Sequence, residues 1–507
     1  MIVSILANIV STVLSAALSL LLTPYIIKHV GKELYSFYPI ANNIISYIWV
    51  ITLALNSMAS RFITIEIVRK NTLKAHQYFS SVFIANIIMS GLLAIPMTLL
   101  IVYSNSIFNI PQGAVQSVQI LFIFLFVSTL VNLIFSVYEV ATFTKERMDL
   151  RGYKDIGRAL LRGGLLLFLF CFLAPKIEYI GLAVFVASIY NAFFAFVISK
   201  KLIPEYKISL SNYSVQAIKE LISSGVWNSV NNIGGLLSMS LIIVLANILI
   251  DEKASGNVAI SSTIPHFLSS VNYAVVGVLI PRIANQYAKS DSIALKNTVQ
   301  RTQEVLGIIC TIPIVLLLCY GKDFFGLWVP NEDANRLQLL SIIITMPTLI
   351  SSKMWTIHSL NVTNNTIRNP AVLHIVLGLI SLFLTIVLLN TVSRSEFVVA
   401  AVPSAIISCF YLFYIPTYTA TKMNYPVFTF YPNIIKSVIC SILLIVLIWG
   451  ARTLFSIKIS SWADLIIIGF FSEIVGALLY FNIVLSQDSR KFVLNFVTSF
   501  LLKQKKI

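Results

Sequence analysis

Residues 108–121 read FNIPQGAVQSVQIL, and residues 327–340 read LWVPNEDANRLQLL. The two stretches share a proline, at Pro111 and Pro330, and a Gln-x-Leu triplet that starts at Gln119 and Gln338. Both pairs are 219 residues apart along the chain. Because a fixed spacing between matching segments is the sign of an internal repeat, the sequence predicts two copies of one structural unit.

Three further landmarks keep nearly the same spacing. The matched pairs are Asn8 with Asn228, Arg61 with Arg282, and Pro96 with Pro313, at offsets of 220, 221 and 217. Each copy contains six long apolar runs, so both copies enter a membrane with the same orientation. This parallel repeat is the plan of many secondary transporters, in which the substrate site lies between the halves near the bilayer midplane.

The composition is that of a membrane protein. Of the 507 residues, 58% are hydrophobic and 11% are charged, with a mean hydropathy of +0.88. A soluble domain carries about 25% charged residues. Apolar runs long enough to cross the bilayer recur along the chain. The weakest is the fifth, because its start carries Arg158 and Arg162. The fourteen runs lie near 3–25, 35–60, 78–103, 116–141, 158–174, 179–199, 221–249, 256–281, 298–319, 337–357, 371–391, 397–418, 433–454 and 463–485.

We therefore predict an all-α integral membrane protein with about fourteen transmembrane helices. Two parallel six-helix repeats are followed by two C-terminal helices. The predicted segments are a six-helix lobe at 1–202, a cytoplasmic linker at 203–220, a second six-helix lobe at 221–422, helices thirteen and fourteen at 423–487, and a basic cytoplasmic tail at 488–507.

The distribution of basic residues explains the net charge of +16. With the N-terminus in the cytoplasm, 27 of the 36 lysines and arginines fall on the cytoplasmic side. This is the positive-inside pattern, so we expect a multi-pass protein of the cytoplasmic membrane with both termini in the cytoplasm. Topology and attraction to anionic membrane lipids account for the excess, and no nucleic-acid partner is needed.

No motif of an enzyme is found. The chain has no glycine-rich phosphate loop, no nucleophile elbow, and no His/Cys cluster with the spacing of a metal site. The five cysteines all lie in apolar runs and form no CxxC pair. We expect a non-enzymatic protein without a cofactor or metal.

Polar residues inside the predicted spans are costly, and they carry the functional signal. The first, second and seventh runs each place polar side chains on one helical face by three–four spacing. Two interpretations stay open: a water-filled cavity lined by helices one, two, seven and eight, or packing of helices through small and hydrogen-bonding residues. The candidates for substrate contact are Asn8, Asn43, Asn228, Asn232 and Asn272.

Arg61 and Arg282 occupy equivalent places near the cytoplasmic ends of helices two and eight. A guanidinium offers a fork of donors that suits phosphate oxygens, so one arginine from each half could clamp an anionic head group. The alternative is that both side chains extend to the membrane interface and only fix the topology.

Two other ionisable residues are candidates for ion or proton coupling. His266 follows Pro265 near the middle of helix eight, and Glu473 lies at mid-span in helix fourteen. Each could instead have a structural role. Lys353 and His358, at the inner end of helix ten, are expected at the membrane interface.

Three stretches of the first 90 residues resemble Wzx-type polysaccharide flippases, which belong to the superfamily of multidrug, oligosaccharidyl-lipid and polysaccharide exporters. They are Thr23-Pro-Tyr-Ile-Ile27, Ala54-Leu-Asn-Ser-Met-Ala-Ser-Arg-Phe-Ile63 and Tyr78-Phe-Ser-Ser-Val-Phe-Ile-Ala-Asn86. The resemblance implies two six-helix bundles in a V around a cationic cavity. It also implies that Arg61 and Arg282 are the positions that best fit the cavity arginines of the family.

The same resemblance implies a function. A polyprenyl-pyrophosphate-linked oligosaccharide would move from the inner to the outer leaflet by alternating access, for synthesis of surface or capsular polysaccharide or O-antigen. Polysaccharide polymerase and export machinery are the implied partners. In a related family that flips the peptidoglycan precursor, two extra C-terminal helices form a groove for the lipid tail, and helices thirteen and fourteen could do likewise.

Other functions remain open at this point. A multidrug/cation antiporter of the same superfamily typically keeps an acidic residue in a lobe cavity, and helices one, two, seven and eight hold none within their spans. A peptidoglycan-precursor flippase is a second alternative. A polysaccharide polymerase would be expected to have a large outward loop, and a scaffold would not need matched arginines and asparagines in two halves.

Overall fold

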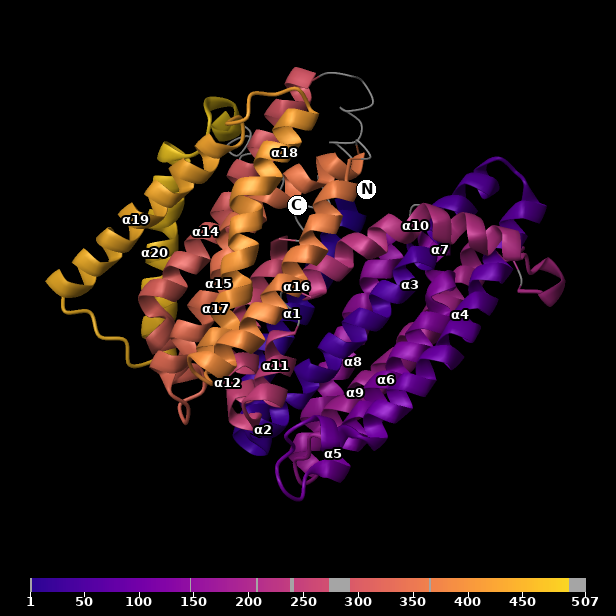
Figure 1. The fold of residues 1–507 in the computed structure, drawn as a ribbon, viewed down its shortest axis with the longest axis horizontal. Helices are drawn as coiled ribbons and strands as arrows, with labels where there is room; N and C mark the ends of the chain where they lie inside the picture. The colour runs from indigo at the N-terminus through magenta and orange to yellow at the C-terminus, as the bar shows by residue number, and fades with distance from the viewer. Residues whose placement is uncertain are drawn as a thin grey trace, which may run out of the picture. The chain divides into compact units, whose positions relative to one another are not determined.

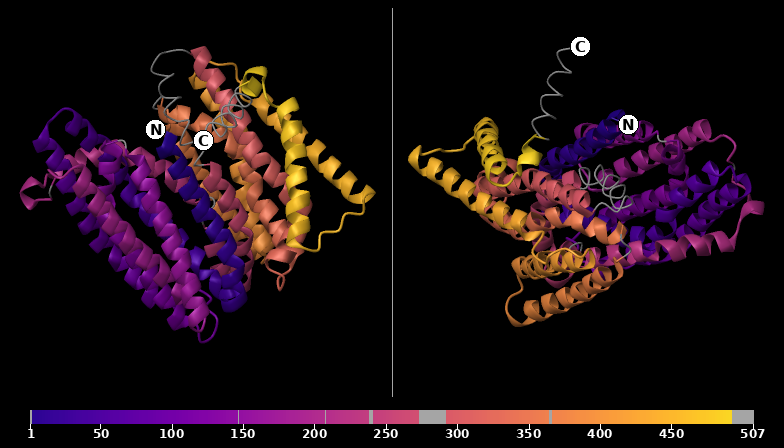
Figure 2. Two further views of the ribbon diagram at one scale, coloured as in Figure 1. Left: turned by 180° about the vertical axis from the view of Figure 1, so that it is seen from behind. Right: turned by 90° about the horizontal axis from the view of Figure 1, so that it is seen from above.

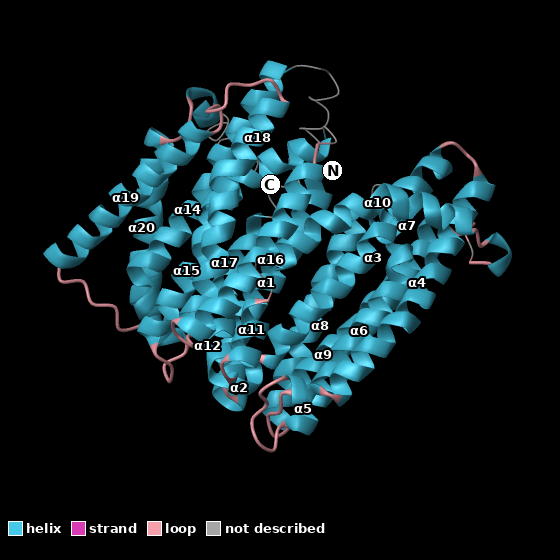
Figure 3. Cartoon of the chain, viewed as in Figure 1, coloured by secondary structure: helices cyan, strands magenta, loops and turns pink. Residues whose placement is uncertain are grey.

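The computed structural model describes residues 2–145, 147–206, 208–237, 241–272, 292–363 and 366–491. Every regular element in these ranges is a helix, as Figure 3 shows. This confirms the predicted all-α membrane fold. Eleven helices of the described ranges are long and apolar enough to cross a membrane.

The chain forms two compact units, and each is described separately. Unit 1 contains Met1–Thr263 and Arg368–Pro403, and unit 2 contains Ile264–Ile367 and Ser404–Ile507. The chain is traced from indigo at the N-terminus to yellow at the C-terminus in Figure 1.

The first part of unit 1 follows the predicted runs one to six. Its elements are α1 (Ile2–Val30), α2 (Lys32–Tyr35), α3 (Phe37–Val68), α4 (Thr72–Val102), α5 (Ser104–Ile107), α6 (Val115–Phe135), η1 (Ser136–Glu139), α7 (Val140–Thr144), α8 (Met148–Phe172) and α9 (Glu178–Leu202). Among them, α1 packs on α8, α8 on α9, α9 on α6, and α3 on α4.

The second part of unit 1 comes from later in the chain. Its elements are η2 (Leu210–Asn212), α10 (Val215–Gly235), α11 (Ile242–Leu249), α12 (Glu252–Ser261), α16 (Arg368–Thr391) and the start of α17 (Glu396–Cys409). α10 packs against both α3 and α16.

Unit 2 consists of long helices around a second core. Its elements are α14 (Ser292–Trp328), α15 (Ala334–Thr363), the end of α17, the π-helical turn η4 (Phe410–Tyr414), α18 (Ile415–Lys422), α19 (Tyr431–Leu454) and α20 (Trp462–Ile483). Residues 263–272 are also helical. α19 and α20, the yellow pair in Figure 2, pack on each other and on α14.

The contact between α3 and α10 is close because a glycine lies at its centre. A Cβ atom at Gly225 would overlap the carbonyl oxygen of Ala54. Four residues after Gly225, the hydroxyl of Ser229 donates to the carbonyl of Val50 over 2.8 Å. With no side chain at Gly225, the two backbones approach as they do at small-residue interfaces between membrane helices.

α8 is the described helix that departs most from a simple membrane span. It has 25 residues, enough to cross the bilayer, but it is not among the eleven apolar spans. Its first fifteen residues include Arg151, Lys154, Asp155, Arg158 and Arg162. Charge of this density inside a helix of a membrane protein needs partners or a function.

Candidate functional site

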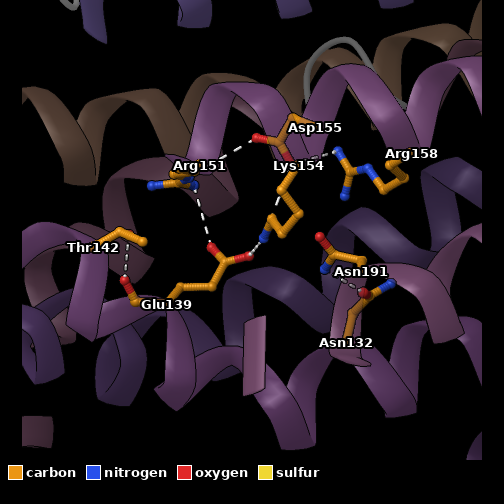
Figure 4. Close-up of polar contacts among 8 residues, drawn as sticks. All are labelled: Asn132, Glu139, Thr142, Arg151, Lys154, Asp155, Arg158 and Asn191. Atoms are coloured by element: carbon orange, nitrogen blue, oxygen red, sulfur yellow. Dashed lines mark hydrogen bonds and ion pairs between the residues drawn. The ribbon is translucent and has the colours of Figure 1, made fainter. Parts of the chain in front are cut away.

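The charges at the start of α8 are largely neutralised by Glu139 of η1. The Nζ of Lys154 donates to the Oε1 of Glu139 over 2.6 Å, and Arg151 lies 3.4 Å from the other carboxylate oxygen. Lys154 is buried, with its side chain 3% exposed. Figure 4 shows Arg151 and Lys154 converging on Glu139, with Arg158 beyond Asp155. These ion pairs hold the start of α8 against η1, the short helix that follows α6.

Before α8, the connection is neutralised in the same way. Arg147 donates from its Nε and Nη2 to the two carboxylate oxygens of Asp149 over 3.0 and 2.8 Å. This bidentate hydrogen bond from the Arg147 guanidinium lowers the pKa of the Asp149 carboxyl below its usual value. The pair precedes the apolar run and is exposed, so it belongs to the edge of the membrane domain.

Farther along α8 the compensation becomes weaker. The Arg158 guanidinium has Asp155 at 3.8 Å and is 44% exposed. Arg162, one turn later, donates from its Nη2 to the hydroxyl of Ser19 over 3.0 Å. In the part of the chain that the structure describes, no carboxylate forms an ion pair with Arg162. The positive charge of α8 is therefore concentrated at Arg158 and Arg162, which we call the α8 cationic face.

The depth of this face follows from helix geometry. Arg158 and Arg162 are ten and fourteen residues from Met148, which places them about 15 and 21 Å along the helix axis. An arginine cannot shed its proton, so Arg162 brings a full charge into the span. Such a charge is expensive unless an anion or water compensates it.

The polar stripe of α1 lies on the α8 cationic face. Ser19 donates from its hydroxyl to the carbonyl of Ser15 over 3.0 Å while it accepts from Arg162. The Thr23 hydroxyl lies 3.2 Å from that of Tyr35 of α2. Near the far end of α8, Tyr25 lies 3.7 Å from the sulfur of Cys171, so α1 and α8 run parallel. Thus the predicted polar stripe of helix one packs on α8, and Ser19 of the stripe contacts the Arg162 guanidinium.

The predicted site residues of unit 1 are partly described. Arg61 is exposed on α3, and Asn43 is buried eighteen residues earlier on the same helix. That spacing is about 27 Å of helix, so the two side chains cannot hold the same small group. Asn232 is exposed on α10, at the level where Tyr47 of α3 donates to the carbonyl of Leu236. The side chains of Asn8 and Asn228 are outside what the structure describes.

The other predicted site residues belong to unit 2. Asn272 is buried, and its Oδ1 has no hydrogen-bond partner in the described structure. His266 is exposed in the helical segment 263–272, and Glu473 is half-buried on α20. Arg282 lies outside the described residues. The proposed cavity between helices one, two, seven and eight therefore stays a prediction.

One finding about unit 2 was not expected from the sequence. The side chain of Lys353, which we expected to extend to the membrane interface, is fully buried among α14, α15, α19 and α20. The amine donates to the hydroxyl of Thr311 and to the carbonyl of Leu349. Helical periodicity alone does not reveal such partners.

Arg162 is the residue that the sequence interpretation missed. The signal was present, because Arg158 and Arg162 made the fifth run the least convincing span. Their spacing of four residues puts both on one helical face, and a pair of charges in an otherwise convincing span is itself a functional mark.

Comparison with known proteins gives the fold a precedent. The structure of the lipid II flippase MurJ, in an inward closed conformation, matches 95% of this chain and 99% of its own, with a TM-score of 0.65 at 13% identity. An inward-facing multidrug resistance MATE family transporter of the MOP superfamily matches 83% of this chain and 94% of its own, with a TM-score of 0.61 at 12% identity. The fold is that of the MurJ and MATE transporters.

Among curated proteins, this chain is 26% identical to EpsK, a membrane protein of Bacillus subtilis (strain 168). The match extends over 495 residues and covers 96% of each chain. No protein-family model matches the sequence. The two solved structures named above are a flippase and a transporter.

Proposed function

We propose that this protein is a flippase for a polyprenyl-pyrophosphate-linked oligosaccharide, and that it serves the synthesis of a surface polysaccharide. The observation that carries the proposal is Arg162, a permanent charge about 21 Å inside α8 whose described polar partner is the hydroxyl of Ser19. A pyrophosphate provides the anion that such a guanidinium lacks, because its oxygens match the guanidinium fork.

The spacing of the α8 cationic face suits two phosphates. Residues four apart on a helix have Cβ atoms about 6 Å apart, and long side chains extend that reach. Arg158 and Arg162 can therefore contact neighbouring phosphoryl groups, while serines and asparagines of unit 1 hydrogen-bond to sugar hydroxyls. Arg61 and Arg282 remain the proposed cytoplasmic clamp at which the head group first binds.

The extent of the structural matches supports a lipid-linked substrate over a drug. MurJ, a lipid II flippase, matches 95% of the chain, whereas the MATE transporter matches 83%. The last two long helices of the chain are α19 (Tyr431–Leu454) and α20 (Trp462–Ile483). Both helices expose apolar side chains, such as Ile466 and Trp449. We propose that they accommodate the polyprenyl tail.

Two alternatives have specific support. The first is a peptidoglycan-precursor flippase, because MurJ is a lipid II flippase. Its substrate would differ from the one proposed here only in the sugar and peptide that the lipid carries. The shared MATE fold supports a multidrug/cation antiporter. Against the antiporter, the described acid nearest the α8 cationic face, Asp155, lies among Arg151, Lys154 and Arg158 and is not free to hold a cation.

Deleting the gene tests the proposal. In the deletion strain, we expect lipid-linked oligosaccharide to accumulate in the inner leaflet, where an impermeant glycosidase or lectin added outside cannot reach it. The intact gene should restore access, and Arg162→Gln should not. Arg147→Gln is the matched control, because that arginine is exposed and already paired with Asp149. Unchanged leaflet distribution in the deletion strain would reject the proposal.

A further inference from the structure

A fully buried lysine lies inside unit 2, far along the chain from the α8 cationic face. The Nζ of Lys353, on α15, donates to the hydroxyl oxygen of Thr311 over 3.3 Å and to the carbonyl of Leu349 over 3.2 Å. Its residue is 0% exposed. The ion pairs that the structure describes in unit 2 are Arg301–Asp488 and Arg452–Asp323, so neither neutralises this amine.

A glycine on the neighbouring helix leaves room for the Lys353 side chain. Gly307 of α14 faces both Lys353 and the hydroxyl of Tyr480 from α20, and a Cβ atom there would overlap that hydroxyl. Tyr480 in turn lies 2.7 Å from the hydroxyl of Ser437 on α19. Four helices thus contribute to one dry polar layer around the amine.

The neighbouring titratable groups carry no compensating charge in their ordinary states. Cys310 of α14 and Cys440 of α19 are close enough to interact electrostatically with Lys353. Tyr480 of α20 completes the layer. On α15 itself, His358 follows five residues later, and on α18, which also packs against α15, Tyr418 donates to the carbonyl of Thr366.

Further polar groups lie on α14 toward the end of α20. Thr311 is a hydrogen-bond partner of Tyr480, and Glu304 is close enough to affect Tyr480 electrostatically. Glu304 is buried, and it accepts from the backbone N–H and the hydroxyl of Ser486 over 3.1 and 3.0 Å. Ser486 follows the last turn of α20, next to the exposed Arg301–Asp488 pair.

The geometry favours a neutral amine in this packing. A neutral lysine has two N–H donors, and the site offers two acceptors, Thr311 and the carbonyl of Leu349. An ammonium would bring a third donor and an uncompensated charge into a dry interior, which costs several kcal/mol. Lysine can avoid that cost by releasing its proton, whereas arginine cannot.

We propose that Lys353 is a reversible proton-binding site, neutral in the packed form of unit 2 and protonated when α14, α15, α19 and α20 loosen enough to admit water. The proton is exchanged with the water that this loosening admits. If the protein is a flippase as proposed above, this site couples its conformational cycle to the proton gradient.

The protonation itself can be tested without any transport assay. For the full-length protein in detergent, the melting temperature is measured from pH 6 to pH 10 for the wild type and for Lys353→Met. Over the pH range in which the folded form has lost the Lys353 proton and the unfolded form still holds it, the stability of the wild type should rise with pH relative to the variant. We expect a relative rise of about 1–3 °C per pH unit.

A lysine on the surface of the same unit provides the control. Lys436→Met on α19 removes an exposed amine and should leave the pH profile parallel to that of the wild type. If Lys353→Met does not accumulate, Lys353→Gln serves in its place. Parallel profiles for the wild type and the Lys353 variant would overturn the proposal.

Coupling is tested in proteoliposomes with a short-chain polyprenyl pyrophosphate that carries one oligosaccharide unit. An imposed pH gradient should change the wild-type flipping rate several-fold and leave the rate of Lys353→Met unchanged. Equal wild-type rates with and without the gradient would reject coupling. If the wild type does not move this probe at all, the proposed function fails, and the proton site is decided by the melting profiles alone.

Discussion

The guanidinium of Arg162 in α8 and the hydroxyl of Ser19 in α1 are joined by a hydrogen bond of 3.0 Å. The two residues are 143 positions apart in the chain. A hydroxyl has no net charge, so this contact orients the guanidinium without neutralising it. Arg162 is therefore held in place while its charge stays available to an anionic ligand.

Substitutions at this contact should separate charge from orientation. Arg162→Gln removes the charge, and we expect flipping to fall at least 100-fold, since a phosphate contact by a charged donor is lost. Ser19→Ala removes only the orienting hydroxyl and should cost about 2- to 10-fold. Transport is measured in proteoliposomes with a labelled polyprenyl-pyrophosphate oligosaccharide. Equal activity of Arg162→Gln and the wild type would exclude α8 from the substrate path.

Arg61 should contribute at the binding step. Because it is exposed on α3, its removal leaves the protein folded but weakens capture of the pyrophosphate. We expect Arg61→Gln to raise the substrate concentration at half-maximal rate about 10-fold, with a smaller change in the maximal rate. Arg69→Gln is the matched control, since that arginine directly follows the same helix and bonds to Glu66 over 3.5 Å. The same loss in both variants would mean that Arg61 has only a topological role.

Gly225 should tolerate no side chain. In Gly225→Ala, the new methyl would overlap the carbonyl oxygen of Ala54, so α3 and α10 must move apart. We expect a loss of about 1–3 kcal/mol in stability, seen as a lower melting temperature in detergent. The control is Gly91→Ala on α4, where the methyl meets open space. That variant should be neutral or more stable by up to about 1 kcal/mol.

Glu139 is expected to be structural. Glu139→Gln would leave the buried ammonium of Lys154 without its carboxylate. We expect about 1–3 kcal/mol of destabilisation, less than for a fully buried pair because the Glu139 side chain is 29% exposed. The double variant Glu139→Gln/Lys154→Met should recover much of this loss, because both charges are gone. Melting temperatures of the single and double variants check the expectation, and equal losses in both would contradict it.

Much of the fold was predictable because a bilayer restricts the choices. The apolar runs had to be helices, since only helices and closed barrels satisfy backbone hydrogen bonds in hydrocarbon. Run length then predicted α4, α9, α16 and α19 closely. The seventh run was less regular than expected, because it is described as two helices, of which α10 ends at Gly235 and α11 begins at Ile242.

The site was harder to predict, because it depends on which faces meet. Helical spacing placed Ser15, Ser19 and Thr23 in one stripe, yet only the structure reveals that Arg162 lies against it. The burial of Lys353 was not foreseen for the same reason. Its position near the end of a run suggested an interfacial side chain, whereas its neighbours Thr311 and Tyr480 come from helices distant in sequence.

The charge of α8 also bears on how the protein is made. A helix with this many basic residues partitions poorly into lipid by itself, whereas its hairpin partner α9 is strongly apolar. The two residues that contact the basic side chains of α8, Ser19 and Glu139, are both synthesised before it. The N-terminal-to-C-terminal order of synthesis thus gives a marginal segment its binding partners in advance, and moving α8 ahead of α1 by circular permutation would remove that benefit.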